Sequence, residues 1–133
     1  MRYMIDTNIC IFIIKNKPIN VINRFLQLNP DDICISSITY SELSYGVYKS
    51  KAIEKNKAAL LMFLSSISIL PFDDSDAEEY GKVRTKLEKD GTPIGPMDLL
   101  IASHAKNRNL IVVTNNTREF ERVDDLKIED WTK

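Results

Sequence analysis

Four acidic residues stand at positions where a carboxylate is uncommon, and their types and spacing could support metal chemistry. Asp6 and Glu119 come shortly after short apolar runs, whereas Glu42 and Asp98 interrupt the apolar faces of expected helices. Carboxylates at short range from one another bind either a proton or a cation. Oxygen ligands without clustered His or Cys select Mg²⁺, for which Mn²⁺ can substitute. The four acids therefore predict a divalent-metal site, unless two or three of them lie on the surface and never meet.

Asp98 begins the apolar face of an expected helix. Residues three or four apart share one side of a helix, which places Asp98 in line with Ile101, Ala102 and Ala105. That face is apolar and small, as close packing on a sheet requires, and Ser103 is expected to lie away from it. An acid turned inward is costly unless something pairs with it. The position of Asp98 is thus better explained by a ligand than by packing.

Glu42 shows the same pattern in another expected helix. Ile38, Glu42 and Tyr45 follow the spacing of one helix face, so Glu42 is expected to interrupt an apolar stripe. Ser36-Ser37 supplies the helix start directly after an apolar run. Glu42 therefore falls in the second turn of a helix that leaves the end of a strand.

Short apolar runs alternate with amphipathic segments along the chain. Strands are expected at residues 3–5, 33–35, 67–72, 110–113 and 126–128, and helices at 9–14, 19–28, 38–48, 51–67, 73–90 and 97–108. Such alternation favours an α/β fold with a mostly parallel sheet of four to five strands, covered on both faces as a three-layer α/β/α sandwich. Ligands of such sheets bind outside the carboxyl ends of the strands, where the acids are expected to meet.

Length and composition limit the classes of function. Residues 1–133 are expected to form one domain. Their 18 basic and 19 acidic residues give a net charge of −1, which excludes a uniformly basic nucleic-acid binder. The longest apolar runs, residues 9–14 and 58–64, are far too short to cross a membrane. Cys10 and Cys34 lie in apolar stretches without metal-type spacing. They are expected to be buried thiols in a reducing, cytoplasmic compartment.

The order and spacing of several short motifs resemble the PIN-domain ribonucleases, and among these the VapC toxins of bacterial type II toxin–antitoxin modules. The resemblance spans essentially the whole chain. The motifs that carry it are Met4-Ile5-Asp6-Thr7-Asn8, Ser36-Ser37 with Glu42, Gly95-Pro96-Met97-Asp98-Leu99-Leu100-Ile101-Ala102, Thr114-Asn115-Asn116-Thr117-Arg118-Glu119-Phe120 and Glu129-Asp130-Trp131.

The resemblance assigns roles to individual residues. Asp6, Glu42 and Asp98 match the metal-binding acids of the family. Glu119 matches a fourth acid that is usually Asp, and its extra methylene is compatible with contact to the metal through water. Three further residues match those that orient the acids by hydrogen bonds: Thr7, Asn8 and Asn116.

The implied activity is that of a Mg²⁺-dependent endoribonuclease toxin, in which a metal-activated water hydrolyses an RNA phosphodiester. A ribonuclease scheme based on two His residues is disfavoured because His104 is the only His, and it is expected at the surface or in packing. Arg118, beside Glu119, is the expected phosphate contact, and basic residues also cluster at 49–57. The resemblance makes a tRNA anticodon loop the leading substrate, with initiator tRNA first.

The resemblance to the family also implies protein partners. Two other interpretations of the acidic site remain open. The expected partners are a VapB-type antitoxin, in a toxin–antitoxin hetero-oligomer, and a second copy of the chain in a homodimer, with no membrane involved. The alternative is an acidic pocket without hydrolytic activity, either receiver-like or a PIN fold that only binds RNA. A receiver needs an acceptor Asp at the end of a mid-chain strand, but the runs there lead into Ser36 and Pro71.

Overall fold

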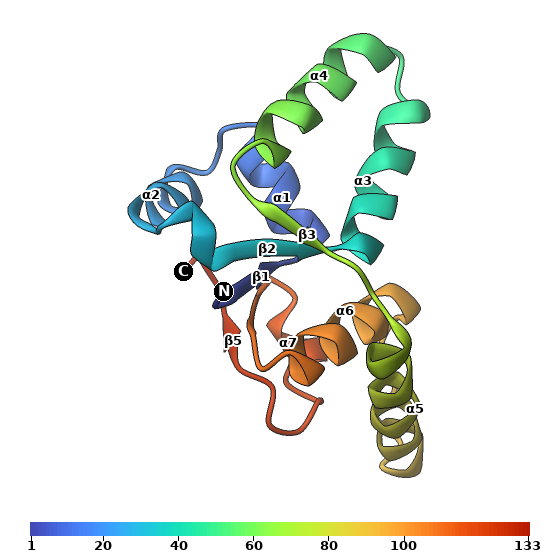
Figure 1. Cartoon of the computed structure of the whole chain (residues 1–133). Helices are drawn as coiled ribbons and strands as arrows, with labels where there is room; N and C mark the ends of the chain where they lie inside the picture. Colours follow the sequence, from blue (N-terminus) through green and yellow to red (C-terminus); the bar gives the residue numbers. More distant parts are fainter.

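The computed structural model describes all of residues 1–133 and has a five-stranded sheet between two layers of helices (Figure 1). Every neighbouring pair of strands is parallel, and the order across the sheet is β3-β2-β1-β4-β5. The strands are β1 (Tyr3–Ile5), β2 (Ile33–Ser36), β3 (Ser68–Leu70), β4 (Ile111–Val113) and β5 (Ile128–Glu129). The predicted α/β sandwich is therefore confirmed, with a sheet that is parallel throughout.

Helices cover both faces of the sheet. One layer contains α1 (Thr7–Ile14), α2 (Ile19–Gln27), α3 (Ser37–Tyr48) and α4 (Ile53–Leu64), and the other contains α5 (Asp74–Lys89), α6 (Pro96–Asn107) and α7 (Thr117–Phe120). A single 3₁₀ turn (Pro30–Asp32) precedes β2. None of these helices combines the length and the apolar character that a membrane crossing requires.

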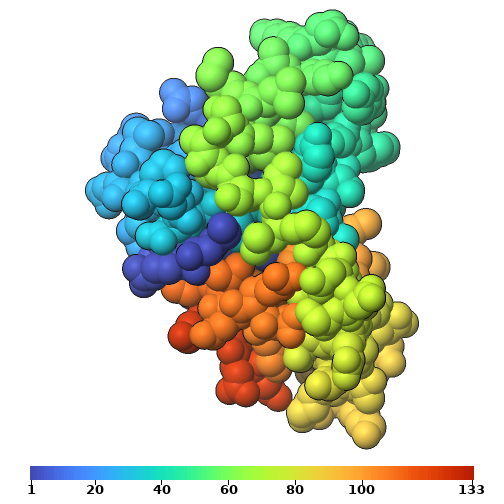
Figure 2. All heavy atoms as spheres, in the orientation of Figure 1, coloured from blue at the N-terminus to red at the C-terminus, as the bar shows by residue number.

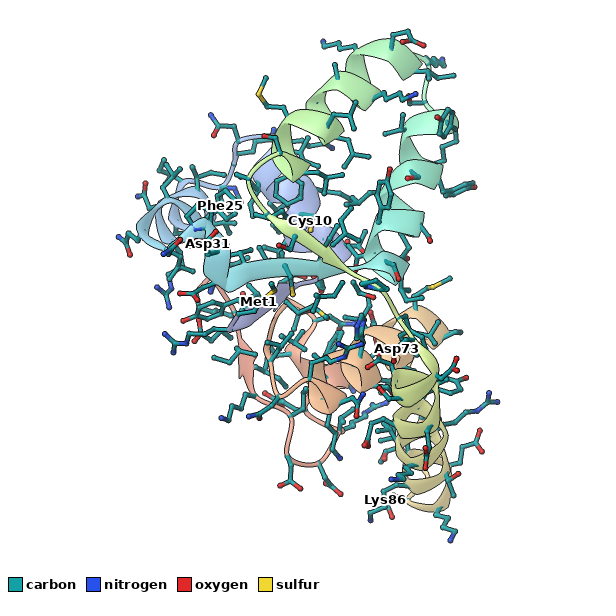
Figure 3. All side chains as sticks on the ribbon, viewed as in Figure 1. Met1, Cys10, Phe25, Asp31, Asp73 and Lys86 are labelled. Atoms are coloured by element: carbon teal, nitrogen blue, oxygen red, sulfur yellow. The ribbon has the colours of Figure 1, made fainter.

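Strand side chains alternate between two hydrophobic cores, as the pleat of a strand requires. In β1, Tyr3 and Ile5 belong to the core under α1–α4, whereas Met4 belongs to the core under α5–α7. The two thiols are buried and free, as expected, and they fall in different cores. Cys10 lies between α1 and the sheet (Figure 3), and Cys34 faces the opposite layer.

Several predicted boundaries were wrong by a few residues. α4 is shorter than the predicted helix at 51–67, because Ser65 ends it with a hydroxyl that donates to the carbonyl of Met62. The last strand begins two residues later and ends one residue later than predicted, since Ile128 pairs with Val112 and Glu129 with Val113 in the sheet. This shift matters for the site because it moves the chain that follows β5 up to the carboxyl edge.

Two predictions of helix faces were also wrong. The face Ile101, Ala102 and Ala105 is buried as expected, but Ser103 is buried with it, and its hydroxyl donates to the carbonyl of Leu99 at 2.7 Å. In α3 the expected stripe is not the buried one, since Tyr45 is 66% exposed. The residues of α3 that face the core are Thr39, Leu43 and Val47. Small hydroxyl side chains are buried at little cost when a backbone carbonyl accepts their proton.

His104 is a fully buried packing residue and does not lie at the surface. Its Nδ1 lies 2.8 Å from the hydroxyl of Ser36, its ring packs edge-on against Phe72, and its Nε2 lies 3.5 Å from Asp76. Burial lowers the pKa of the imidazole more than the nearby carboxylate raises it. A neutral His104 thus connects the end of β2 to the layer that contains α5 and α6.

A network of charged side chains joins α5 to α6. Asp73 caps α5 (labelled in Figure 3), and Arg108 donates to Asp73 and to the buried Asp76 at 3.0 and 2.8 Å. Asn107 adds a bond of 2.7 Å to the other oxygen of Asp76. Burial alone would raise the pKa of Asp76, but these hydrogen bonds hold it well below its usual value. The network fixes the C-terminal end of α6, whose N-terminal turn contains Asp98.

Candidate active site

Asp6 stands at the carboxyl end of the central strand of the sheet. Its backbone N–H continues the ladder by donating to the carbonyl of Val113 at 2.9 Å. Its carboxylate caps α1 by accepting the N–H of Ile9 at 3.0 Å, and the residue is only 4% exposed. The strand end and the helix cap together give this carboxylate one defined direction.

The environment of Asp6 raises the pKa of its carboxyl group when no cation is present. Burial raises the pKa of Asp6 from 3.8 to about 6, and the negative charges of Glu42 and Asp130 add to the effect. Hydrogen bonds from Thr114 and the amide of Ile9 only partly offset it. Asp6 therefore lacks the positive partner that a buried carboxylate normally needs.

Glu42 is brought to the same edge by the turn between β2 and α3. Ser36 ends β2, and its hydroxyl caps α3 by accepting the N–H of Ile38 at 3.0 Å. In the second turn of α3, Oε1 of Glu42 accepts a hydrogen bond of 2.6 Å from the hydroxyl of Thr7. Since Thr7 directly follows Asp6, this bond fixes Glu42 next to the first acid.

The other two acids are held together by one amide. Nδ2 of Asn116 donates to Oδ2 of Asp98 at 2.9 Å and to Oε2 of Glu119 at 2.5 Å. The backbone N–H of Gly95 donates to Oε1 of Glu119 at 3.0 Å. The hydroxyl of Thr114 accepts the N–H of Asn116 at 2.9 Å and so shapes the turn after β4. These bonds orient two carboxylates from different helices toward each other.

Asp98 and Glu119 titrate as a pair. Burial, together with the neighbouring Glu119 and Asp6, raises the pKa of Asp98 from 3.8 to about 7. Hydrogen bonds from Asp98 and Asn116 lower the pKa of Glu119. Near neutral pH the pair therefore holds a proton mainly on Asp98 when no cation is bound.

The four predicted acids thus lie at one edge of the sheet, in two linked pairs, but they do not form a closed metal cage. No three Asp, Glu, His or Cys side chains of the structure are close enough together to hold an ion as they stand. None of the ion pairs involves any of the four acids, although the more distant charge of Arg122 helps to lower the pKa of Glu119. An uncompensated set of carboxylate oxygens fits a hard cation such as Mg²⁺ or Mn²⁺.

Two further residues that the sequence assigned to the site, Asn8 and Arg118, make no hydrogen bond to the four acids. Asn8 is exposed, and its side chain makes no hydrogen bond to any of the acids, so it differs from Thr7 and Asn116. Arg118 is exposed on α7 beside Glu119 and takes part in no hydrogen bond or ion pair. Its guanidinium is therefore free of contacts within the protein, and its predicted contact with an RNA phosphate stays a prediction.

The sequence analysis missed the contributions of Gly95 and Asp130 to this site. The amide of Gly95 holds Glu119, although the sequence suggested only a loop before Pro96. Asp130 acts electrostatically on Asp6 from 124 positions away, because β5 runs parallel to β4 with Glu129 opposite Val113. Had the last strand been predicted to end at Glu129, Asp130 would have been expected at the carboxyl edge of the sheet.

Comparison with known proteins shows which family and which individual proteins the chain is similar to. The profile of the family described as "PIN domain" matches residues 3–126. A protein of Shigella flexneri named tRNA(fMet)-specific endonuclease VapC is 52% identical over 132 residues, which cover 99% of each chain.

Two solved structures have nearly the same fold. The structure described as DNA-bound VapBC from Salmonella typhimurium matches with a TM-score of 0.93 and 50% identity, over 98% of both chains. VapBC2 from Rickettsia felis, bound to a DNA fragment from its promoter, matches with a TM-score of 0.92 and 45% identity, over 98% of this chain and 99% of that one. The similarity extends over the whole chain, so it includes every element that carries an acid.

Proposed function

The chain belongs to the PIN-domain family, and on that premise we propose that it is a metal-dependent endoribonuclease, the toxin of a type II toxin–antitoxin pair. The observation that supports this most directly is the set of four carboxylates at one sheet edge, none of which forms an ion pair. Four clustered carboxylates lower the stability of a protein that binds no cation there, because their negative charges repel one another. The raised pKa values of Asp6 and Asp98 come mainly from burial, to which the neighbouring acids add.

The residues that would hold the ion are Asp6, Glu42 and Asp98, with Glu119 acting directly or through water. When bound, Mg²⁺ supplies a Lewis acid that neutralises charge on the attacked phosphate and lowers the pKa of a water molecule beside it. The protein's own part is to keep the carboxylates oriented. Thr7 fixes the rotamer of Glu42, and Asn116 does the same for Asp98 and Glu119.

The phosphate of the substrate must approach a region of negative charge. Arg118 is the free cation nearest in sequence to the acids, and it would contact a phosphate next to the scissile one. Attack by water leaves a 3′-hydroxyl and a 5′-phosphate and does not use the 2′-hydroxyl. Preference for RNA must therefore come from contacts outside the acid cluster.

We propose tRNA as the substrate, with the anticodon loop of initiator tRNA as the cleavage site and the cytoplasm as the place of action. The relative from Shigella flexneri is named for tRNA(fMet) and shares 52% of its residues with this chain. A loop of unpaired bases can be read base by base, whereas a paired RNA helix is recognised mainly by its shape. A small protein without overall positive charge depends on such local contacts.

We also propose two protein partners. Both similar solved structures are of VapBC complexes, which supports a VapB-type antitoxin for this chain. A basic side chain of the antitoxin placed among the carboxylates would supply the missing positive charge and block the ion. The second partner is another copy of this chain, with which it would form a homodimer inside a larger toxin–antitoxin hetero-oligomer.

The decisive experiment is cleavage of purified initiator tRNA, with mapping of both new ends. One dominant cut in the anticodon loop, with a 3′-hydroxyl and a 5′-phosphate, loss of activity in EDTA and recovery with Mg²⁺ are expected. Asp6→Asn and Asp98→Asn should be inactive. Full cleavage by both variants at saturating Mg²⁺, or a 2′,3′-cyclic phosphate end, would contradict the proposal.

The alternative of a non-hydrolytic acidic pocket makes a different prediction. A receiver-like site needs an acceptor Asp at the end of a mid-chain strand, but β2 ends at Ser36 and β3 is followed by Pro71. A PIN fold that only binds RNA would bind the tRNA and never shorten it. The same cleavage experiment separates these readings.

A further inference from the structure

The exposed side of α3 presents two tyrosines to solvent. Tyr45 is 66% exposed and Tyr48 is 58% exposed, and neither hydroxyl takes part in a hydrogen bond within the structure. The opposite side of the helix, with Leu43 and Val47, packs against the core. Two large rings turned to solvent on one helix are unlike the scattered exposed apolar residues of an ordinary surface.

Tyr45 continues the side of α3 on which Glu42 lies, and Tyr48 is about one turn beyond Tyr45 and is also turned toward solvent. Tyr45 is three residues beyond Glu42, which is about 4.5 Å along the helix axis and within one helical turn. Lys49 lies one further turn along the same side. The row therefore starts at the acid cluster and runs away from the sheet along the α3–α4 hairpin.

Each tyrosine ring is paired with a lysine ammonium. Nζ of Lys49 lies 4.9 Å from the ring centre of Tyr45, and Nζ of Lys57 on α4 lies 5.9 Å from that of Tyr48. Lys51 and Lys55 add positive charge to the same hairpin. The hairpin forms a lobe that projects from the rest of the molecule (Figure 2). It is thus a basic, aromatic surface on a chain whose net charge is −1.

We propose that Tyr45 and Tyr48, with Lys49 and Lys57 beside their rings, form a base-stacking platform that binds unpaired bases of the RNA loop next to the acid cluster. The platform is the set of these four side chains, and the proposal rests on the proposed ribonuclease function. Aromatic rings beside cations are the usual means of binding single-stranded nucleic acid, because every base has a flat face and every nucleotide a phosphate. The lysines attract the phosphates that the four acids repel.

The test is a binding measurement with a protein that cannot cut. With Asp98→Asn as the common background, a fluorescein-labelled RNA hairpin that has an unpaired loop is titrated, and anisotropy gives the dissociation constant. Tyr45→Ala is expected to weaken binding about 10-fold, whereas Tyr45→Phe keeps the ring and stays within about twofold. Lys49→Gln should reduce the slope of log affinity against log salt by about 0.7, and Tyr45→Ala should leave that slope unchanged.

Tyr40 provides a matched control on the same helix. It is 36% exposed and lies two residues before Glu42, so about 160° of helical rotation separates the two side chains. Tyr40→Ala should bind the hairpin as the background protein does. A fully paired RNA of the same length should be insensitive to Tyr45→Ala. Irradiation of a hairpin with 5-iodouridine in its loop should cross-link to Tyr45 or Tyr48, as peptide mass spectrometry would show.

The outcomes separate the platform from the proposed function. If the wild-type protein cuts the loop but Tyr45→Ala and Tyr48→Ala bind it unchanged, the platform is wrong and the ribonuclease stands. If the wild-type protein neither binds nor cuts RNA, both are wrong. If Tyr45→Ala changes the molar mass in light scattering or abolishes capture of an antitoxin while RNA binding is intact, this surface binds protein and the platform is overturned.

Discussion

The hydroxyl of Thr7 donates a hydrogen bond of 2.6 Å to Oε1 of Glu42, although 35 residues separate them. This bond ties the first turn of α1, which Asp6 caps, to the second turn of α3. It is the only hydrogen bond that the carboxylate of Glu42 accepts in the structure. The orientation of one acid therefore depends on the residue that follows another acid.

Thr7→Val removes this donor and keeps the shape of the side chain. Loss of a hydrogen bond that orients a metal-binding carboxylate typically lowers metal affinity or activity about 10- to 100-fold. We expect a loss of that size in RNA cleavage and a higher Mg²⁺ requirement, with little change in thermal stability. Thr7→Ser retains the hydroxyl and should remain close to wild type. Equal cleavage by the valine and serine variants would show that this bond has no role.

Asp6→Asn should stabilise the metal-free protein at neutral pH. The folded state raises the pKa of Asp6 from 3.8 to about 6, so its stabilising protonated form is lost as the pH rises through about 6. A shift of about two pKa units corresponds to at most about 3 kcal/mol. Urea unfolding in EDTA should show a gain toward that size at pH 8 and almost none at pH 4. Asparagine still caps α1, so the variant should keep its fold.

The effect of Mg²⁺ on the melting temperature can be compared between the wild-type protein and Asp6→Asn. The ion should raise the melting temperature of the wild-type protein, because binding to the folded state alone stabilises it. Asp6→Asn should show a much smaller increase. A magnesium response that is the same in both proteins would place the ion somewhere other than at Asp6.

Asn116→Ala should separate the pair Asp98 and Glu119. Without the shared amide, Asp98 and Glu119 each lose a hydrogen bond that orients them, and cleavage should fall about 10- to 100-fold. The exposed neighbour Asn115 makes no such bond, and Asn115→Ala is the matched control. Glu119→Gln should be milder than Asp98→Asn, because Glu119 is the acid that departs from the family pattern. Activity of Asn116→Ala equal to that of the control would argue against the bridging role.

Asp76→Asn should destabilise the protein without touching the site. Asp76 is fully buried, and removing its charge leaves Arg108 with a weaker partner at the junction of α5 and α6. Because the Arg108 that remains is 32% exposed, the loss in the free energy of unfolding should be smaller than the roughly 3–5 kcal/mol typical of a fully buried ion pair. The pKa of Asp76 lies below its ordinary value of 3.8, so this stabilisation is present above pH 4 and is lost as the pH falls further. The difference between variant and wild type should therefore shrink in acid, which denaturant unfolding at several pH values would measure.

Arg118→Gln should weaken RNA binding in a manner that depends on salt. One lost phosphate contact on a single strand reduces the slope of log affinity against log salt by about 0.7. The exposed Lys89 at the end of α5 supplies the control, because it lies in no contact with the acids. An unchanged slope for Arg118→Gln would remove Arg118 from the RNA contacts.

The short-range features of this protein could be predicted from its sequence. A run of apolar residues followed by Asp6 is enough to predict a strand that ends at a helix cap, because both depend on neighbouring residues. The apolar face that begins at Asp98 is equally local, and the structure contains it as expected. The alternation of strands and helices predicted the parallel sheet, whose carboxyl edge is where the acids lie.

The choice of buried face and the closeness of the acids required the tertiary structure. In α3 two stripes are equally plausible from spacing, and α1, α4 and the sheet decide that Leu43 and Val47 face inward while Tyr45 faces solvent. Ser103 is buried because a carbonyl one turn away accepts its proton, and the burial of His104 depends on the distant Ser36, which contacts its Nδ1 while Nε2 makes no hydrogen bond. Asp130 acts on Asp6 only because β5 adds to the sheet in one register. The periodicity of a sequence shows which faces of a helix or strand are apolar enough to be buried. Which of these faces is buried, and which charged side chains lie close together, depends on how all the elements pack.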